Sequence, residues 1–155
     1  DVVDLHVDVY EPLGAPAGRP AIVMIHGGGF STGTRQNPEM VTFANYFAER
    51  GWVAVSIDYR LIADRGTVWP AWLDYVDANF SSAQRSQVAA IYPAARDAKA
   101  AFRWLHANQA ALQIDTNYVT ALGGSAGAYL AIVAGVTEPE DFRDEIDLQS
   151  DPTLS

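Results

Sequence analysis

The stretch that decides the fold of this chain is Tyr118-Val119-Thr120-Ala121-Leu122-Gly123-Gly124-Ser125-Ala126-Gly127. Its first part is apolar enough for a buried strand, and its second part matches the pattern G-x-S-x-G. A tight turn between a strand and a helix exposes the serine hydroxyl, and the glycines of the pattern leave room for that turn. We therefore predict that Ser125 is a catalytic nucleophile. The alternative is that Ser125 only caps the helix that follows.

Upstream of this turn, strand-like and helix-like stretches alternate. Ala21–Ile25 is a short, largely β-branched run followed by glycines, which is typical of a strand buried on both faces. Val3–Val9 alternates apolar and polar residues, which predicts a half-exposed antiparallel strand near a sheet edge. A second buried strand is expected at Trp52–Ile57, and helices are expected to begin at Asn37–Pro38, near Pro93 and after Ser125. The pattern predicts an α/β fold with a doubly wound, mostly parallel sheet and helices on both faces.

A second motif, His26-Gly27-Gly28-Gly29-Phe30, directly follows the first buried strand. Three consecutive glycines cost conformational entropy, and they make sense where the backbone must approach a ligand. The N–H groups of Gly28 and Gly29, together with that of Ala126, are candidates for an oxyanion hole. A phosphate-binding loop is the rival interpretation, but the pattern G-x-x-x-x-G-K-[ST] is absent. The third interpretation is a flexible turn that binds no ligand.

Both motifs are expected at one edge of the sheet, because ligands bind beyond the carboxyl ends of parallel strands. Asp58-Tyr59-Arg60 also follows a strand and belongs to the same edge. The aromatic-rich stretch Leu61–Tyr92 leaves from there and fits neither a helical nor a strand period. It either walls an apolar substrate pocket or packs on the surface away from the site.

At these residues the sequence resembles the α/β-hydrolase superfamily, in its carboxylesterase and hormone-sensitive-lipase-like branches. The resemblance rests on four motifs in family order: His26–Phe30, Asp58–Leu61, Ala95–Leu105 and Gly123–Gly127. It implies Ser125 as the nucleophile, an oxyanion hole formed by Gly28, Gly29 and Ala126, ester substrates and no cofactor. It also implies that His26 and Gly27 support the glycine loop. The family joins its second and third motifs by a shorter connection, so residues 61–92 are expected to be an insertion near the active-site edge.

The catalytic triad is incomplete, because no histidine follows Ser125 in the chain, whereas this fold orders its triad as Ser, acid, His. His6 and His106 are expected to face solvent. The acids nearest the motifs are given structural interpretations: Asp58 pairs with Arg60, Asp97 lies in the first turn of a helix, Asp115 lies in a turn, and the acidic tail after Thr137 is solvated.

Residues 1–155 are therefore expected to be the N-terminal half of a hydrolase domain. The remaining strands, the acid and the histidine would lie on a segment outside this chain, which is expected to pack beside Tyr118–Gly123, because that strand is too apolar for an exposed edge. Two other functions stay open: a non-catalytic ligand-binding module on the same fold, and a peptidase or amidase of the superfamily.

Composition excludes several classes. The formal net charge of −9, from 19 acids and 10 bases, argues against binding nucleic acid or an anionic membrane surface. The absence of cysteine excludes a disulfide framework, a thiolate zinc site and a cysteine nucleophile. No apolar run is long enough to span a membrane, and no histidine or carboxylate cluster has metal-ligand spacing. The location of the protein is left undetermined, with soluble, secreted and periplasmic all open.

Overall fold

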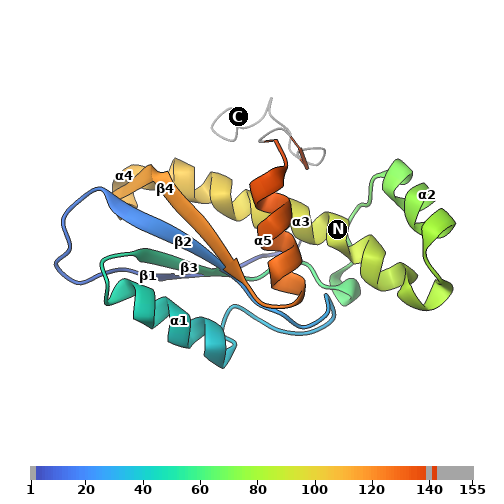
Figure 1. Ribbon diagram of the computed structural model, residues 1–155, viewed down its shortest axis with the longest axis horizontal. Helices are drawn as coiled ribbons and strands as arrows, with labels where there is room; N and C mark the ends of the chain where they lie inside the picture. The colour runs from blue at the N-terminus through green and yellow to red at the C-terminus, as the bar shows by residue number, and fades with distance from the viewer. Residues whose placement is uncertain (1–2, 139–140, 143–155) are drawn as a thin grey trace.

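The computed structural model describes residues 3–138 and 141–142, and within them the chain forms a four-stranded sheet in the order β1-β3-β2-β4 (Figure 1). The strands are β1 (Val7–Tyr10), β2 (Arg19–Ile25), β3 (Val53–Ile57) and β4 (Ile114–Gly123). The helices are α1 (Pro38–Ala48), the 3₁₀ turn η1 (Ile62–Asp64), α2 (Pro70–Asn79), α3 (Ser82–Ala107), α4 (Gln109–Leu112) and α5 (Ala126–Val136). β2 pairs in parallel with β3 and β4, and β1 pairs antiparallel with β3. The predicted mostly parallel α/β sheet and its antiparallel edge strand are confirmed.

Helices cover both faces of this sheet, as predicted. Along β2, Val23 and Ile25 belong to a buried cluster that includes residues of α3 and α5, whereas Ile22 and Met24 pack with Met40 of α1. Alternate side chains of one strand thus enter two different cores. This explains why β2 reads as an unbroken apolar run rather than an alternating one.

The two outer strands differ in character. β1 is half-exposed, as the alternating pattern predicted, but it spans Val7–Tyr10 and not Val3–Val9. Among the described residues β4 pairs only with β2, so it forms the other edge of the sheet. Tyr118 on this strand is 67% exposed. A long, partly apolar strand with one open side is unusual, because such an edge can pair with other chains.

The stretch 61–92 is more regular than its sequence suggested. It contains η1, α2 and the first part of α3, and α3 begins at Ser82 rather than near Pro93. Pro93 therefore lies inside a 26-residue helix, where a proline removes one backbone hydrogen bond. The residues that follow Pro93 are buried against the sheet, and this packing offsets the lost hydrogen bond. The preference of proline for the start of a helix predicted the wrong boundary, because that preference takes no account of tertiary packing.

The acidic tail falls mostly outside the described residues. Glu138 and Asp141 are exposed, in agreement with the expected solvated surface. The acids from 144 onward, and Glu140, lie outside the described part of the chain. No helix in residues 3–138 and 141–142 combines the length and the hydrophobicity that crossing a bilayer requires.

Candidate active site

Ser125 occupies the turn between β4 and α5 in a conformation that few non-glycine residues adopt. Its φ is 53° and its ψ is −116°, and the residue is exposed. Backbone strain of this kind persists only where the surroundings impose it, and it is most common at functional sites. The side chain of Ser125 makes no capping hydrogen bond to α5, which disfavours a role as a simple N-cap.

The flanking glycines impose this turn by close packing. A Cβ atom on Gly123 would collide with the backbone of Gly127. A Cβ atom on Gly127 would lie 2.7 Å from the carbonyl oxygen of His26 and closer still to that of Ile25. A Cβ atom on Gly124, by contrast, would meet nothing within 4 Å. The two outer glycines of the pattern are therefore required by space, and the inner one is not.

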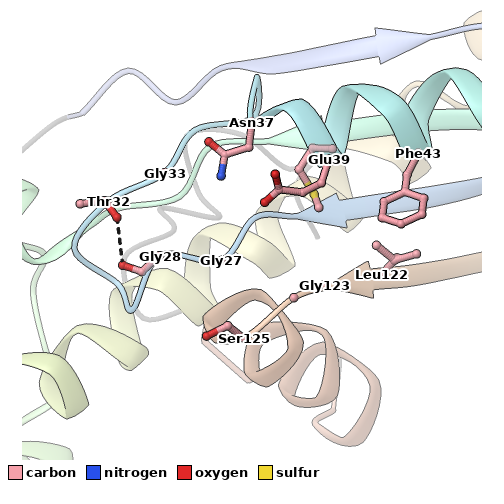
Figure 2. A pocket seen from close by; sticks show the side chains of 12 residues that line it. Gly27, Gly28, Thr32, Gly33, Asn37, Glu39, Phe43, Leu122, Gly123 and Ser125 are labelled. Carbon is pink, nitrogen blue, oxygen red and sulfur yellow. Dashed lines mark hydrogen bonds between the residues drawn. The ribbon is translucent and has the colours of Figure 1, made fainter.

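The glycine loop, which we define as residues 27–37 between β2 and α1, lies directly beside this turn. A Cβ atom on Gly27 would be 2.9 Å from the carbonyl oxygen of Gly124 and 3.4 Å from the Cβ of Ser125. Both motifs border one open cleft of about 790 Å³ (Figure 2). Its lining residues are Gly27, Gly28, Thr32, Gly33, Asn37, Glu39, Met40, Phe43, Leu122, Gly123, Gly124 and Ser125.

The backbone donors expected at an oxyanion hole have no acceptor within the described residues: no hydrogen bond there starts from the N–H of Gly28, Gly29 or Ala126. Ala126 is the first residue of α5, so its N–H adds the positive end of a helix dipole. Gly28 and Gly29 have φ values of 123° and 61°, which glycine adopts without steric cost. Unused donors beside an exposed serine suit a ligand oxygen that carries negative charge.

His26 is fixed beneath the glycine loop. It is 1% exposed, its ring stacks on Tyr59 at 4.3 Å between centroids, and the Tyr59 hydroxyl donates to the His26 carbonyl oxygen at 2.9 Å. Its Nδ1 lies 2.6 Å from the carbonyl oxygen of Gly27, which requires a proton on Nδ1. Burial lowers the pKa of His26 and raises the pKa of Tyr59 to about 12, so both are neutral near pH 7.

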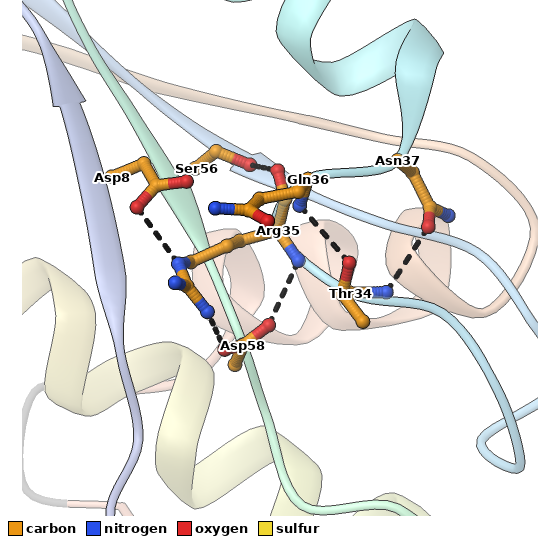
Figure 3. Close-up of polar contacts among 7 residues, drawn as sticks. All are labelled: Asp8, Thr34, Arg35, Gln36, Asn37, Ser56 and Asp58. Atoms are coloured by element: carbon orange, nitrogen blue, oxygen red, sulfur yellow. Dashed lines mark hydrogen bonds and ion pairs between the residues drawn. The ribbon is translucent and has the colours of Figure 1, made fainter.

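The far end of the loop is held by a cationic residue that the sequence patterns did not indicate. Arg35 donates from its backbone N–H and from Nη1 to the two carboxylate oxygens of Asp58, at 2.8 Å and 2.6 Å (Figure 3). Its Nε donates to Asp8 on β1 at 2.8 Å, and the Ser56 hydroxyl donates to its carbonyl oxygen at 2.7 Å. These two carboxylates raise the pKa of the Arg35 guanidinium.

The predicted pair between Asp58 and Arg60 is therefore wrong. Arg60 instead binds Asp97 in a buried contact, with its backbone N–H 2.8 Å from Oδ2 and its Nη2 2.7 Å from Oδ1. Asp97 lies in the middle of α3 and not in a first turn, because the helix starts eleven residues earlier than expected. Pairing by nearness in sequence failed because residues distant in the chain, Arg35 and Asp97, occupy the two binding positions after β3.

Several remaining residues can also be placed. His6 and His106 are exposed, as expected. Asp115 was expected in a turn but is the second residue of β4, where its carboxylate accepts from the backbone N–H of Asn117 at 3.0 Å. Two residues of the site carried no functional signal in the sequence: Glu39 lines the cleft, and the Gln87 side chain donates to the Gly29 carbonyl oxygen at 3.2 Å. Within the described residues, no group of His, Cys, Asp and Glu could hold a metal ion.

Among parallel sheets covered on both faces, a strained serine beside a glycine loop is the arrangement found in α/β hydrolases. A model of the BD-FAE family, an α/β-hydrolase-type domain, matches residues 7–81 and 71–153, and this chain belongs to that family. The resemblance seen in the four sequence motifs is thereby confirmed.

Several known proteins with similar sequence or structure are esterases by name, although a non-reducing polyketide synthase of Preussia isomera also matches, at 28% identity over 98% of this chain and 7% of that protein. Carboxylesterase 3 of Homo sapiens is 32% identical over 134 residues, which cover 85% of this chain and 20% of that protein. The propionate-bound esterase Est2 of Thermogutta terrifontis has a TM-score of 0.65 at 30% identity, covering 90% of this chain and 44% of its own. The same esterase phosphoramylated by tabun has a TM-score of 0.63 at 31% identity, covering 83% and 40%. This chain spans less than half the length of each.

Proposed function

We propose that this chain carries the nucleophile and the oxyanion hole of a carboxylic-ester hydrolase. The observation that carries the proposal is the exposed Ser125 at φ 53°, placed beside a glycine loop whose N–H groups have no acceptor within the described residues. The esterase names of similar proteins support the reaction class. The substrate class is a small-molecule ester.

In the proposed reaction, Ser125 Oγ attacks the ester carbonyl carbon, and a base takes the hydroxyl proton. The carbonyl oxygen becomes an oxyanion, which accepts hydrogen bonds from Gly28, Gly29 and Ala126. The bond to the alkoxy group then breaks, the alcohol leaves with the proton, and an acyl-enzyme remains. Water adds to this ester in the same way and releases the acid and free Ser125.

The His26 side chain takes a supporting role in this proposal. A peptide group is planar and trans, so the carbonyl of Gly27 and the N–H of Gly28 point in opposite directions. A hydrogen bond from His26 Nδ1 to the Gly27 carbonyl oxygen consequently fixes the direction of the Gly28 N–H. His26 is unsuited to be the base, because its Nδ1 is engaged and its ring is covered by Tyr59.

We further propose that the triad acid and histidine lie on a segment outside this chain, which packs beside β4. Three observations support this proposal: the edge of β4 that has no partner strand among the described residues, the absence of histidine between Ser125 and Ser155, and the exposed apolar side chains of Tyr129, Ile132 and Val136 on α5. Slow amide exchange at Tyr118–Gly123 is expected in an active preparation, and fast exchange there contradicts the proposal.

The nucleophile is tested by Ser125→Ala in the full-length natural protein. Ester turnover should fall by roughly three orders of magnitude or more, because the loss of a triad member removes most of the chemistry. Ser82→Ala, at an exposed serine at the start of α3, should leave turnover unchanged. An organophosphorus reagent should add one adduct to the wild-type protein and none to Ser125→Ala. Unmodified wild-type protein favours a binding module instead.

A further inference from the structure

The carbonyl group of Gly28 is surrounded by donors from the two residues that close the glycine loop. The backbone N–H groups of Ser31 and Thr32 lie 3.0 Å and 3.1 Å from its oxygen. The hydroxyl groups of the same two residues lie 3.1 Å and 3.3 Å from it. Four donors thus converge on one backbone oxygen, although a carbonyl has only two lone pairs.

This oxygen belongs to the same peptide group as the N–H of Gly29. Because the group is planar and trans, the direction of the carbonyl determines the direction of the N–H. In the view of Figure 2 the bond from Thr32 reaches Gly28 on one side of the loop, and Ser125 lies on the other. Donors that hold the carbonyl therefore hold the Gly29 N–H pointing the opposite way.

The local backbone needs such support. Gly28 and Gly29 both have positive φ, and Phe30 between them and Ser31 has φ 60°, a strained value for a residue with a side chain. Ser31 and Thr32 are exposed, so water could satisfy their hydroxyl groups. Both hydroxyls nonetheless turn inward to Gly28, where they add two bonds to the two that the backbone already makes.

We propose that Ser31 and Thr32 are positioning residues for the reaction, which act by aiming the Gly29 N–H at the oxyanion. The inference rests on the proposed function, because it takes Gly29 as an oxyanion donor. His26 would hold the Gly28 N–H through the Gly27 carbonyl, and the Ser31–Thr32 pair would hold the Gly29 N–H through the Gly28 carbonyl. The direction of each of these two N–H donors is then fixed by hydrogen bonds to the carbonyl oxygen of the same peptide group.

The test is the double variant Ser31→Ala/Thr32→Val in the full-length natural protein. It removes both hydroxyls while both backbone N–H bonds remain, so folding should be kept. We expect kcat to fall about tenfold, less than the loss of a whole oxyanion donor costs. KM should stay within about twofold, because the ground-state ester depends little on these donors. Each single variant should lower kcat by about threefold.

Two further variants separate positioning from a general effect. Thr32→Ser restores a hydroxyl at this position and should recover kcat. Thr42→Val makes the same change on α1, where the Thr42 hydroxyl bonds the Pro38 carbonyl oxygen at 2.7 Å, and should leave kcat unchanged. The inference is overturned if the double variant keeps wild-type kcat, if KM rises as much as kcat falls, or if Thr32→Ser behaves like Thr32→Val.

The activity of Ser125→Ala in the same assay distinguishes a failure of this inference from a failure of the proposed function. If Ser125→Ala is inactive and the double variant is normal, only the inference about Ser31 and Thr32 fails. If Ser125→Ala retains full activity, the proposed function fails, and the inference fails with it.

Discussion

The serine turn (Gly123–Gly127) and the glycine loop lie side by side at one cleft, yet they are held in different ways. The serine turn depends on side chains that are missing: Gly123 and Gly127 must lack a Cβ so that β2, β4 and α5 can meet. The glycine loop depends on side chains that are present, above all His26 beneath it and Arg35 at its far end. Sterics fixes the first region, whereas in the second, where Gly28 and Gly33 also lack room for a Cβ atom, hydrogen bonds and ion pairs act in addition to sterics. The two should therefore fail differently when mutated.

The largest effect is expected at the serine turn, with Gly127→Ala. Its Cβ atom would press on the backbone oxygens of Ile25 and His26, which cannot move without disturbing the central strand. We expect a loss of about 4 kcal/mol in the free energy of unfolding, measured by chemical denaturation. Gly124→Ala, where the Cβ would meet nothing within 4 Å, should cost less than about 1 kcal/mol. Equal costs for the two variants would contradict the steric account.

The next largest loss of stability is expected for Gly33→Ala, because a Cβ atom at this position of the glycine loop would collide with its neighbours. Gly33 has φ 105°, and its Cβ would press on the His26 ring and lie 2.5 Å from the Gly27 carbonyl oxygen. We expect a loss of about 3 kcal/mol, which combines backbone strain and collision. Gly14→Ala isolates the strain, because Gly14 has φ 69° and open space around it, and should cost about 1 kcal/mol. If both variants cost the same, the contact with His26 has no energetic role.

A smaller effect is expected for Arg35→Gln, which removes the cation between Asp8 and Asp58. The three side chains are partly exposed, so the ion pairs should contribute only about 1 kcal/mol to the free energy of unfolding. Amide exchange at residues 27–37 should accelerate more than exchange in β2. Arg85→Gln, which breaks the exposed pair with Asp77, should change neither quantity. Uniform acceleration across the sheet would mean that Arg35 stabilises the whole fold and not the loop.

The smallest effect is a pH dependence from His26. Burial lowers the pKa of His26, so between its ordinary pKa of about 6.5 and the lower folded pKa the unfolded chain binds a proton that the folded chain does not. Stability is therefore complete above about pH 6.5 and declines as the pH falls through the folded pKa. His26→Asn keeps a donor near Gly27 and does not titrate, so its stability should decline less between pH 7 and pH 5. Identical pH profiles would show that His26 is not buried in its neutral form.

The difference between the two regions also explains what could be predicted. The Ser125 turn and the runs at β2 and β3 were predicted correctly because each is encoded by neighbouring residues. The start of α3 was not, because burial against the sheet carries the helix through Pro93. The partners of Asp58 and Arg60 were assigned by nearness in sequence, whereas the fold pairs them with Arg35 and Asp97, 23 and 37 residues away.

By itself, then, the sequence determined the strands and helices of an α/β fold, a serine at a strand–helix turn, and a run of glycines directly after a buried strand. Only the tertiary structure decided what holds those elements together: which acid the Arg35 guanidinium reaches, which acid Arg60 binds, and that the Tyr59 ring stacks on His26. The physical reason is the separation along the chain of the residues that interact. Sterics and periodicity act between neighbours in the chain, whereas the hydrogen bonds and ion pairs that orient a site join atoms whose proximity exists only after folding.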